Sequence, residues 1–110
     1  MYYTYILLCT DGSLYTGMTA DIKRRIKEHC SGGARAAKYT RSHKPEKLAA
    51  LWETSSASLA CRLEYRIKQL PAAKKRQLTE NNDFSVFGGE IDEVEYRRES
   101  TEESEFSFDG

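Results

Sequence analysis

The chain has 110 residues, with 17 basic and 17 acidic side chains, so its formal net charge is zero. This length is enough for one hydrophobic core and excludes a second core of ordinary size. No apolar run approaches the ~18 residues of a membrane span, and the N-terminus lacks the pattern of a secretion signal, so we expect a cytoplasmic protein.

The charges are unevenly distributed along the chain. Residues 1–89 hold 15 Lys and Arg and 8 Asp and Glu, a net charge of +7, whereas residues 90–110 hold 2 and 9, a net charge of −7. A basic body favours a polyanionic partner, nucleic acid first, because phosphate contacts by Lys and Arg release counterions. The cysteines are odd in number and have no CxxC spacing, so we expect Cys9, Cys30 and Cys61 to be small buried apolar residues.

A β-hairpin is predicted at the N-terminus. Aromatic, β-branched and aliphatic residues fill positions 2–9 and 14–18, and Asp11-Gly12 is a turn signal between them. A two-residue loop would pair Tyr5 with Met18 and separate Tyr5 from Tyr15. A three-residue loop, with Gly12 in the left-handed region, pairs Tyr5 with Gly17 instead. We favour the second register because it separates aromatic hydroxyls from plain aliphatics. One face then carries Tyr3, Tyr5, Leu7, Tyr15 and Gly17, and the other Ile6, Leu8, Leu14 and Met18.

The first helix is predicted from about Asp21 to Cys30, with Thr19 or Asp21 as its cap and Gly32-Gly33 at its end. Within it, Arg25 and His29 are four residues apart and therefore lie on one face. Ile22 and Ile26 bracket that face. One arginine and one histidine are thus held at the edge of the packed side, which is typical of a functional site.

A basic segment and a third strand follow. Residues 31–47 contain five Lys or Arg and one acid, with Tyr39 and His43 interleaved, and we expect a mobile basic loop. Residues 48–54, LAALWET, predict a buried strand.

Two further helices are predicted after this strand. The serines at 55, 56 and 58 offer caps for the first of them, and Pro71 begins the second, over residues 71–80. Glu64 lies about 90° from the centre of the apolar stripe of the first helix, on the border between its packed face and its solvent-exposed face. That stripe consists of Leu59, Leu63, Ile67 and Leu70.

Periodicity disappears from Asn81 onward. We therefore expect a domain at 1–80 and an acidic tail at 81–110 that is disordered or loosely docked. One hypothesis is that the acidic residues 90–110 fold over the basic body and compete with DNA. The favoured alternative is a solubilising extension, and a third interpretation has the tail presented to a protein partner.

Two tyrosine motifs, an arginine and a glutamate occur in a familiar order. Tyr3-Thr4-Tyr5 and Tyr15-Thr16-Gly17 fall on the two hairpin strands, Arg25 follows Tyr15 by ten residues, and Glu64 lies within LEYRIK. Over roughly residues 1–80 this resembles the GIY-YIG nuclease superfamily, and by size and the run GGARAAKYTRS its small stand-alone bacterial branch. The first motif lacks the glycine and isoleucine of the pattern. The resemblance implies a mixed α/β fold of the α+β type, a three-stranded antiparallel sheet flanked by helices in the order β-β-α-β-α-α.

The resemblance also implies an activity, which is metal-dependent hydrolysis of phosphodiester bonds in DNA, with Mg²⁺ or Mn²⁺ as cofactor and a role in repair or recombination. Glu64 would be the single protein ligand of the metal, since Mg²⁺ takes one or two carboxylates and fills its shell with water and phosphate oxygens. The alternative for Glu64 is a surface pair with Lys68 worth ~0.3 kcal/mol. The main rival function is a non-catalytic nucleic-acid-binding module with the same fold.

Each remaining site residue receives an expected role from the same resemblance. Tyr15 would accept the proton of the attacking water, with Tyr5 positioning that water, and Arg25 would stabilise the phenolate while holding the scissile phosphate. His29 would relay a proton or contact phosphate, or it is a structural histidine. Gly17 would open space for substrate, or it is a strand glycine that allows close packing. Strand packing is the alternative for both tyrosines.

Contacts to DNA are expected from the basic loop, through Arg35, Lys38, Tyr39 and Arg41, as a grip on the backbone without base readout. Little sequence preference follows, with nicked, branched or single-stranded DNA selected by shape. An asparagine of several family members has no clear counterpart, and Asn81 or Asn82 are candidates by position only.

Overall fold

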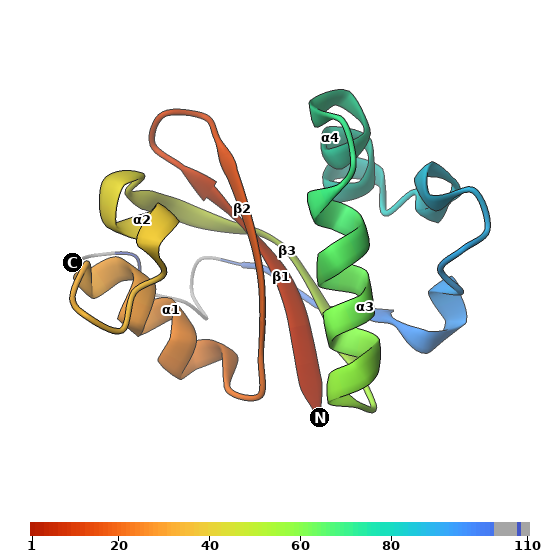
Figure 1. Ribbon diagram of the computed structural model, residues 1–110, viewed down its shortest axis with the longest axis horizontal. Coiled ribbons are helices and arrows are strands. Elements are labelled where there is room, and N and C mark those ends of the chain that lie inside the picture. Colours follow the sequence, from red (N-terminus) through yellow and green to blue (C-terminus); the bar gives the residue numbers. More distant parts are fainter. Residues whose placement is uncertain (103–107, 109–110) are drawn as a thin grey trace.

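An antiparallel sheet organises the computed structural model, which describes residues 1–102 and residue 108. Within that part of the chain the sheet has four strands in the order β2-β1-β3-β4. Figure 1 shows α1 and α2 on one side of the sheet and α3 and α4 on the other. The mixed α+β architecture is confirmed. The strands are β1 Tyr2–Cys9, β2 Leu14–Thr19, β3 Pro45–Thr54 and β4 Arg97–Arg98, and the helices are α1 Ile22–Ser31, α2 Lys38–Ser42, α3 Ala57–Lys68 and α4 Ala72–Asn81.

The hairpin adopts the three-residue loop. Tyr5 pairs with Gly17, the Cys9 amide donates to the Ser13 carbonyl at 2.9 Å, and Gly12 has a φ of 84°. The predicted register is therefore confirmed.

The third strand is longer than predicted and contains an irregularity. Ile6 pairs with Ala50 but Leu7 pairs with Leu48, so Ala49 is an extra residue, as in a β-bulge. Because of this extra residue, Leu48 and Leu51 both pack on the α1 side while Ala50 packs on the α3 side. A continuous apolar run thus supplies both faces of the sheet.

Both faces of the sheet carry a buried cluster. The cluster under α3 and α4 contains Ile6, Ala50, Trp52, Leu63, Ile67 and Leu78, joined by C-terminal residues. The cluster under α1 contains Tyr5, Leu7, Ile26, Leu48 and Leu51. Alternate residues of β1 feed the two clusters, as the strand period requires.

The predicted helix ends agree with the structure. The Asp21 carboxylate accepts from the Arg24 amide at 3.2 Å, and Gly32 ends α1 in the left-handed region. The Ser56 hydroxyl accepts from the Leu59 amide at 3.1 Å and begins α3. Pro71 immediately precedes α4.

The prediction for the basic segment is wrong, because residues 31–47 do not form one loop. α2 lies within it, and β3 already begins at Pro45. A five-residue helix is too short to show a hydrophobic period, and contacts with distant residues hold it, as described below.

The sheet has one strand more than the three predicted. β4 is two arginines, with Arg98 opposite Trp52 and Arg97 opposite Glu53. Two charged residues carry no strand signal, so this pairing follows from the packing around it. Arg98 donates to the Thr79 carbonyl at 2.8 Å, and its guanidinium carbon lies 5.1 Å from the Trp52 ring centre.

Residues after α4 also differ from the expected disordered or loosely docked tail. Two 3₁₀ helices, Phe84–Phe87 and Glu93–Glu95, lead to β4. The Tyr96 hydroxyl donates to the Leu59 carbonyl at 2.7 Å. The core residues of this segment are irregularly spaced within an acidic sequence, so no hydrophobic period predicted their burial. Phe84, Phe87, Ile91 and Tyr96 are buried in the α3-side cluster.

Beyond Glu102, the expectation for residues 103–107 and 109–110 lies outside the described residues. Phe108 packs, partly buried, against the α1-side cluster. Of the three cysteines, Cys9 is buried as predicted, whereas Cys30 is half-buried and Cys61 is exposed. No helix in the described part of the chain is long and apolar enough to cross a membrane.

Candidate active site

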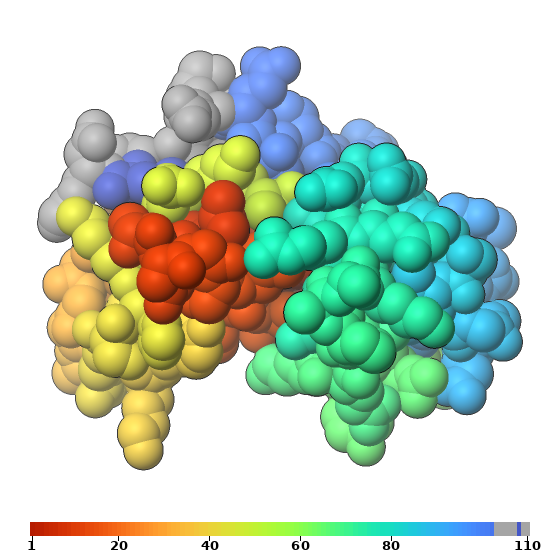
Figure 2. Space-filling view, turned by 90° about the horizontal axis from the view of Figure 1, so that it is seen from above, coloured from red at the N-terminus to blue at the C-terminus, as the bar shows by residue number. Residues whose placement is uncertain are grey.

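The predicted site residues gather at the β2 edge of the sheet, beyond which the described residues add no strand. α1 and α2 flank this edge on one side and α3 on the other (Figure 1). In the space-filling view of Figure 2 a notch separates the yellow residues around α2 from the green residues of α3. The red hairpin lies at its base.

Tyr5 and His29 form the buried centre of the site. The Tyr5 hydroxyl lies 2.7 Å from His29 Nε2, and each residue is only 1% exposed. His29 Nδ1 lies 2.8 Å from the Thr40 hydroxyl, which donates its own hydrogen to the Ala37 carbonyl at 3.1 Å. Thr40 must therefore accept from Nδ1–H, because a hydroxyl has one hydrogen to donate. The bare Nε2 of His29 then accepts the Tyr5 hydrogen.

The two groups have shifted pKa values that suit this arrangement. Burial, and then the positive charge of Arg25, lowers the pKa of His29 to about 4, so the imidazole is neutral at pH 7. Burial raises the pKa of Tyr5, with the neighbouring Tyr15 adding to the effect, so its phenol is protonated at neutral pH. A neutral base thus accepts a hydrogen bond from a protonated phenol.

Arg25 and Glu64 both act on Tyr5, from different helices. Against the effect of burial, Arg25 lowers the pKa of Tyr5 through its charge and a hydrogen bond, and Glu64 raises it through its charge. The Arg25 guanidinium also donates to Glu28 at 3.0 Å and to the Arg35 backbone carbonyl. This sharing fixes the guanidinium between α1 and the segment before α2.

Glu64 is partly exposed, with 24% of its side-chain surface accessible, and its carboxylate lies 3.6 Å from Lys68 Nζ. The surface pair that was the simple alternative is therefore formed. Lys68 Nζ in turn lies 6.0 Å from the centre of the Tyr15 ring. The carboxylate thus faces the same notch as the tyrosines.

Tyr15 is held differently from Tyr5. Its ring centre lies 5.2 Å from that of His29, 6.4 Å from that of Tyr5 and 5.7 Å from that of Tyr39. In the described residues its hydroxyl has no hydrogen-bond partner. Of the two tyrosine hydroxyls, that of Tyr5 is the one hydrogen-bonded to the His29 imidazole.

Gly17 lies against the Tyr5 side chain, which occupies the place that a side chain at position 17 would need. A Cβ at this position would lie 2.5 Å from the Tyr5 hydroxyl oxygen and 2.6 Å from its ring carbon Cζ. The absence of a side chain therefore admits the phenol.

The expected DNA-contacting residues separate into two groups. Arg35, Lys38 and Arg41 are exposed on the α2 side of the notch, and Arg41 donates to the Ala34 carbonyl at 2.9 Å. Tyr39 is instead half-buried, with one ring neighbour in Tyr15 and another in His43.

Two assignments by position need comment. Asn82 is not at the site, since its side-chain oxygen accepts from the Trp52 indole at 2.8 Å, and Asn81 is exposed at the end of α4. Thr40 was missed by sequence reasoning. Its role depends on a contact with His29 that no local pattern signals.

A divalent metal fits the site through one carboxylate. No group of three His, Cys, Asp or Glu side chains that could hold a metal is found among the described residues. Glu64, partly exposed beside the aromatic residues, matches a Mg²⁺ site completed by water and phosphate oxygens.

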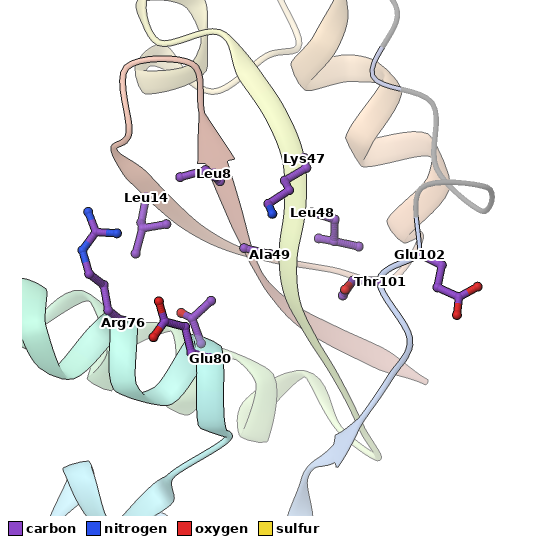
Figure 3. A pocket seen from close by; sticks show the side chains of 10 residues that line it. Leu8, Leu14, Lys47, Leu48, Ala49, Arg76, Glu80, Thr101 and Glu102 are labelled. Carbon is purple, nitrogen blue, oxygen red and sulfur yellow. The ribbon is translucent and has the colours of Figure 1, made fainter.

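A separate pocket of about 430 Å³ lies between α4, the hairpin and β3 (Figure 3). Leu8, Leu14, Arg76 and Glu80 contribute to its lining, and no candidate site residue does. The candidate active site is therefore the notch at β2 and not this pocket.

Comparison with known proteins identifies the family of this chain and several relatives. A family described as the GIY-YIG catalytic domain matches residues 1–77. A UPF0213 protein of Halalkalibacterium halodurans is 52% identical over 77 residues, which cover 70% of this chain and 80% of that protein. A UPF0213 protein of Halobacterium salinarum is 46% identical over 78 residues, which cover 71% and 99%.

Among solved structures, the solution NMR structure of a UPF0213 protein from Bacillus halodurans is similar, with 44% sequence identity and a TM-score of 0.49. The similarity covers 83% of this chain and 97% of that chain. The match of the family to residues 1–77 and the identity to these relatives confirm the family resemblance that the two tyrosine motifs indicated. The chain belongs to the GIY-YIG catalytic domain family, and its similar relatives are UPF0213 proteins.

Proposed function

We propose that this protein is a metal-dependent endonuclease that hydrolyses phosphodiester bonds in DNA, in repair or recombination. The observation that carries the proposal is the hydrogen bond of 2.7 Å between the Tyr5 hydroxyl and His29 Nε2, with Arg25 and Glu64 acting on the same phenol. Its support is a neutral imidazole, a guanidinium and a carboxylate at one notch of a chain that belongs to a nuclease-type domain family.

The proton of the attacking water passes to the Tyr5 oxygen while the hydrogen of Tyr5 moves to His29 Nε2. The water oxygen forms the new bond to phosphorus, the bond to the leaving oxygen breaks, and that oxygen takes a proton from solvent. His29 ends as an imidazolium and Tyr5 as a neutral phenol. This route avoids a standing phenolate, which the raised pKa of Tyr5 disfavours.

Arg25 and Glu64 deal with the charge of the phosphate. The planar guanidinium of Arg25 suits two phosphate oxygens, and its position beside Tyr5 places it near the attacking water. Glu64 would hold the Mg²⁺ or Mn²⁺. When bound, such an ion neutralises charge on the phosphate and assists departure of the leaving oxygen.

The substrate is gripped through its backbone. Arg35, Lys38 and Arg41 are exposed beside the notch, and residues 1–89 carry a net charge of +7. Such contacts position a nucleic acid but read no sequence. We therefore propose little sequence preference, with nicked, branched or single-stranded DNA selected by shape.

The test is cleavage of plasmid and branched DNA with Mg²⁺ or Mn²⁺. The site variants are Glu64→Ala and Arg25→Lys, and their matched controls are Glu80→Ala and Arg24→Ala, which remove an exposed residue of like charge. We expect a fall of about 10²–10³-fold in each site variant and native rates in the controls. Tight, salt-sensitive DNA binding without cutting by any form would contradict the proposal and favour the non-catalytic binding module.

A further inference from the structure

We propose that Asp11, His43 and Tyr39 form a positioning cluster that orients the ring of Tyr15 within the site. The proposal rests on the proposed nuclease function, in which Tyr15 lines the reaction notch. It assigns a task to three residues that the reaction itself does not use. All three come from segments that sequence reasoning treated as a turn and a mobile loop.

The cluster begins with a stack of three rings. The His43 and Tyr39 ring centres are 4.0 Å apart with an interplanar angle of 14°. Tyr39 and Tyr15 are 5.7 Å apart with an angle of 25°. Tyr39 is therefore flanked by His43 and Tyr15, so it is part of the wall of the notch and not a free platform for a nucleobase.

Asp11 anchors the outer end of this stack. Its Oδ2 lies 2.6 Å from His43 Nδ1, and its Oδ1 accepts from the Ser13 amide at 3.0 Å and from the Ser13 hydroxyl at 2.5 Å. The Thr10 amide donates to the Lys44 carbonyl at 2.8 Å next to this pair. A side-chain contact and a backbone contact thus fasten the β1–β2 turn to the end of α2.

Tyr15 needs such an external support. It lies on the edge strand β2 and is half-buried, and its hydroxyl makes no hydrogen bond in the part of the chain that the structure describes. Its aromatic neighbours are the rings of His29, Tyr5 and Tyr39. The ring on the outer side is Tyr39, which His43 covers. Removing His43 would therefore free Tyr39 first and Tyr15 with it.

α2 connects the same support to the second half of the site. Tyr39 packs on Tyr15, and the next residue, Thr40, accepts from His29 Nδ1 at 2.8 Å. His43 also ends the helix, with its amide bonded to the Tyr39 carbonyl at 2.9 Å. A displacement of α2 would thus disturb both rings that face the Tyr5 phenol.

The test compares four variants. His43→Ala removes the stack, His43→Phe keeps an aromatic ring but loses the bond to Asp11, and Asp11→Ala loses the anchor. Ser13→Ala is the matched control, because it removes the hydroxyl bond in the same turn and leaves the Asp11–His43 contact in place. Each is assayed for kcat and KM on the DNA that the native chain cleaves, and for the Tyr15 ring resonances by NMR.

We expect His43→Ala to lower kcat about 10-fold with KM within a factor of two, since a displaced α2 also moves Thr40 and with it His29, and small misplacements of reacting groups cost up to ~10²-fold. His43→Phe should recover most of this loss, Asp11→Ala should fall between the two, and Ser13→Ala should match the native chain. The Tyr15 resonances should move in His43→Ala and stay in Ser13→Ala.

The proposal is overturned if His43→Ala leaves the Tyr15 resonances unchanged. It is also overturned if His43→Ala raises KM alone, which would make His43 a DNA contact, or if Ser13→Ala reproduces the loss. If the native chain cuts no DNA, the nuclease proposal fails. The NMR comparison then still decides whether the cluster positions Tyr15.

Discussion

The two faces of the sheet are both packed, but they bury different chemistry. On the α3 face the centre is aliphatic and aromatic, around Trp52 and Leu63, and the Trp52 indole donates to the half-buried Asn82 at the end of α4. On the α1 face the Tyr5 phenol and the His29 imidazole are buried together and bonded to each other. One strand, β1, feeds both faces, so alternation directs the Tyr5 phenol to one side and aliphatic packing to the other, and Glu64 reaches the notch from α3. Substitutions on the two faces should therefore have different signatures.

The largest effect is expected from Tyr5→Phe on the α1 face. Cleavage should fall about 10²–10⁴-fold, because the relay through His29 needs the hydroxyl. The free energy of unfolding should fall by only about 1–3 kcal/mol, for the His29 nitrogen left without a partner. DNA cleavage and urea unfolding measure the two effects. Tyr65→Phe, on an exposed ring of α3, is the control, and equal cleavage by Tyr5→Phe and native chains would refute the assignment of Tyr5.

Leu63→Ala tests the opposite face. Leu63 is fully buried under α3, so its truncation should lower the free energy of unfolding by about 2–5 kcal/mol. The cleavage rate of the molecules that remain folded should be unchanged. A lower kcat in the fully folded variant would show that the two faces are coupled. It would contradict the expectation that substitutions on the two faces have different effects.

Gly17→Ala places a methyl group where the two properties meet. The new Cβ would lie 2.5 Å from the Tyr5 hydroxyl oxygen, so the phenol must shift away from His29. We expect a loss of stability of about 1–3 kcal/mol together with a loss of cleavage, measured by melting and by the DNA assay. Native cleavage in this variant would mean that the Tyr5–His29 bond is dispensable.

The pH dependence of stability should identify the buried imidazole. Its pKa is lowered from 6.5 to about 4 in the folded chain. Between these values the unfolded chain binds a proton that the folded chain does not, so the stability present above pH 6.5 is lost as the pH falls towards 4. We expect a loss on the order of 3 kcal/mol over this range, because each pKa unit corresponds to about 1.4 kcal/mol. Urea unfolding of native and His29→Gln chains checks it, and the same pH slope in both would exclude His29 as its origin.

The smallest effect is expected at the C-terminus. Truncation after Glu102 keeps Phe84, Ile91 and Tyr96 in the core and removes three acidic residues. The free energy of unfolding should fall by about 1 kcal/mol or less, because the truncation removes the partly buried Phe108. DNA affinity at low salt should change by less than about 2-fold, since a few exposed charges are largely screened. A much larger gain in affinity would support the inhibitory tail.

Local patterns predicted much of the hairpin and the helix caps. The register with Tyr5 opposite Gly17 follows from ring and aliphatic residues on alternate positions and from a three-residue turn. Arg25 and His29 share a face because they are one helical turn apart. These features depend on residues within a few positions of each other, so the chain alone contains the information.

Other features depended on contacts between distant residues. α2 is too short to have a period, and β4 is two arginines paired with β3 beside the buried Phe84 and Tyr96. The hydrogen bond between one of the two tyrosines and a histidine is the clearest case. Each hairpin strand carries a tyrosine of the motif pair, and the hydrogen bond that His29 Nδ1 donates to Thr40 fixes which imidazole nitrogen is bare. Thr40 and Tyr5 are 35 positions apart, so the tertiary structure alone decides which tyrosine has a base beside it.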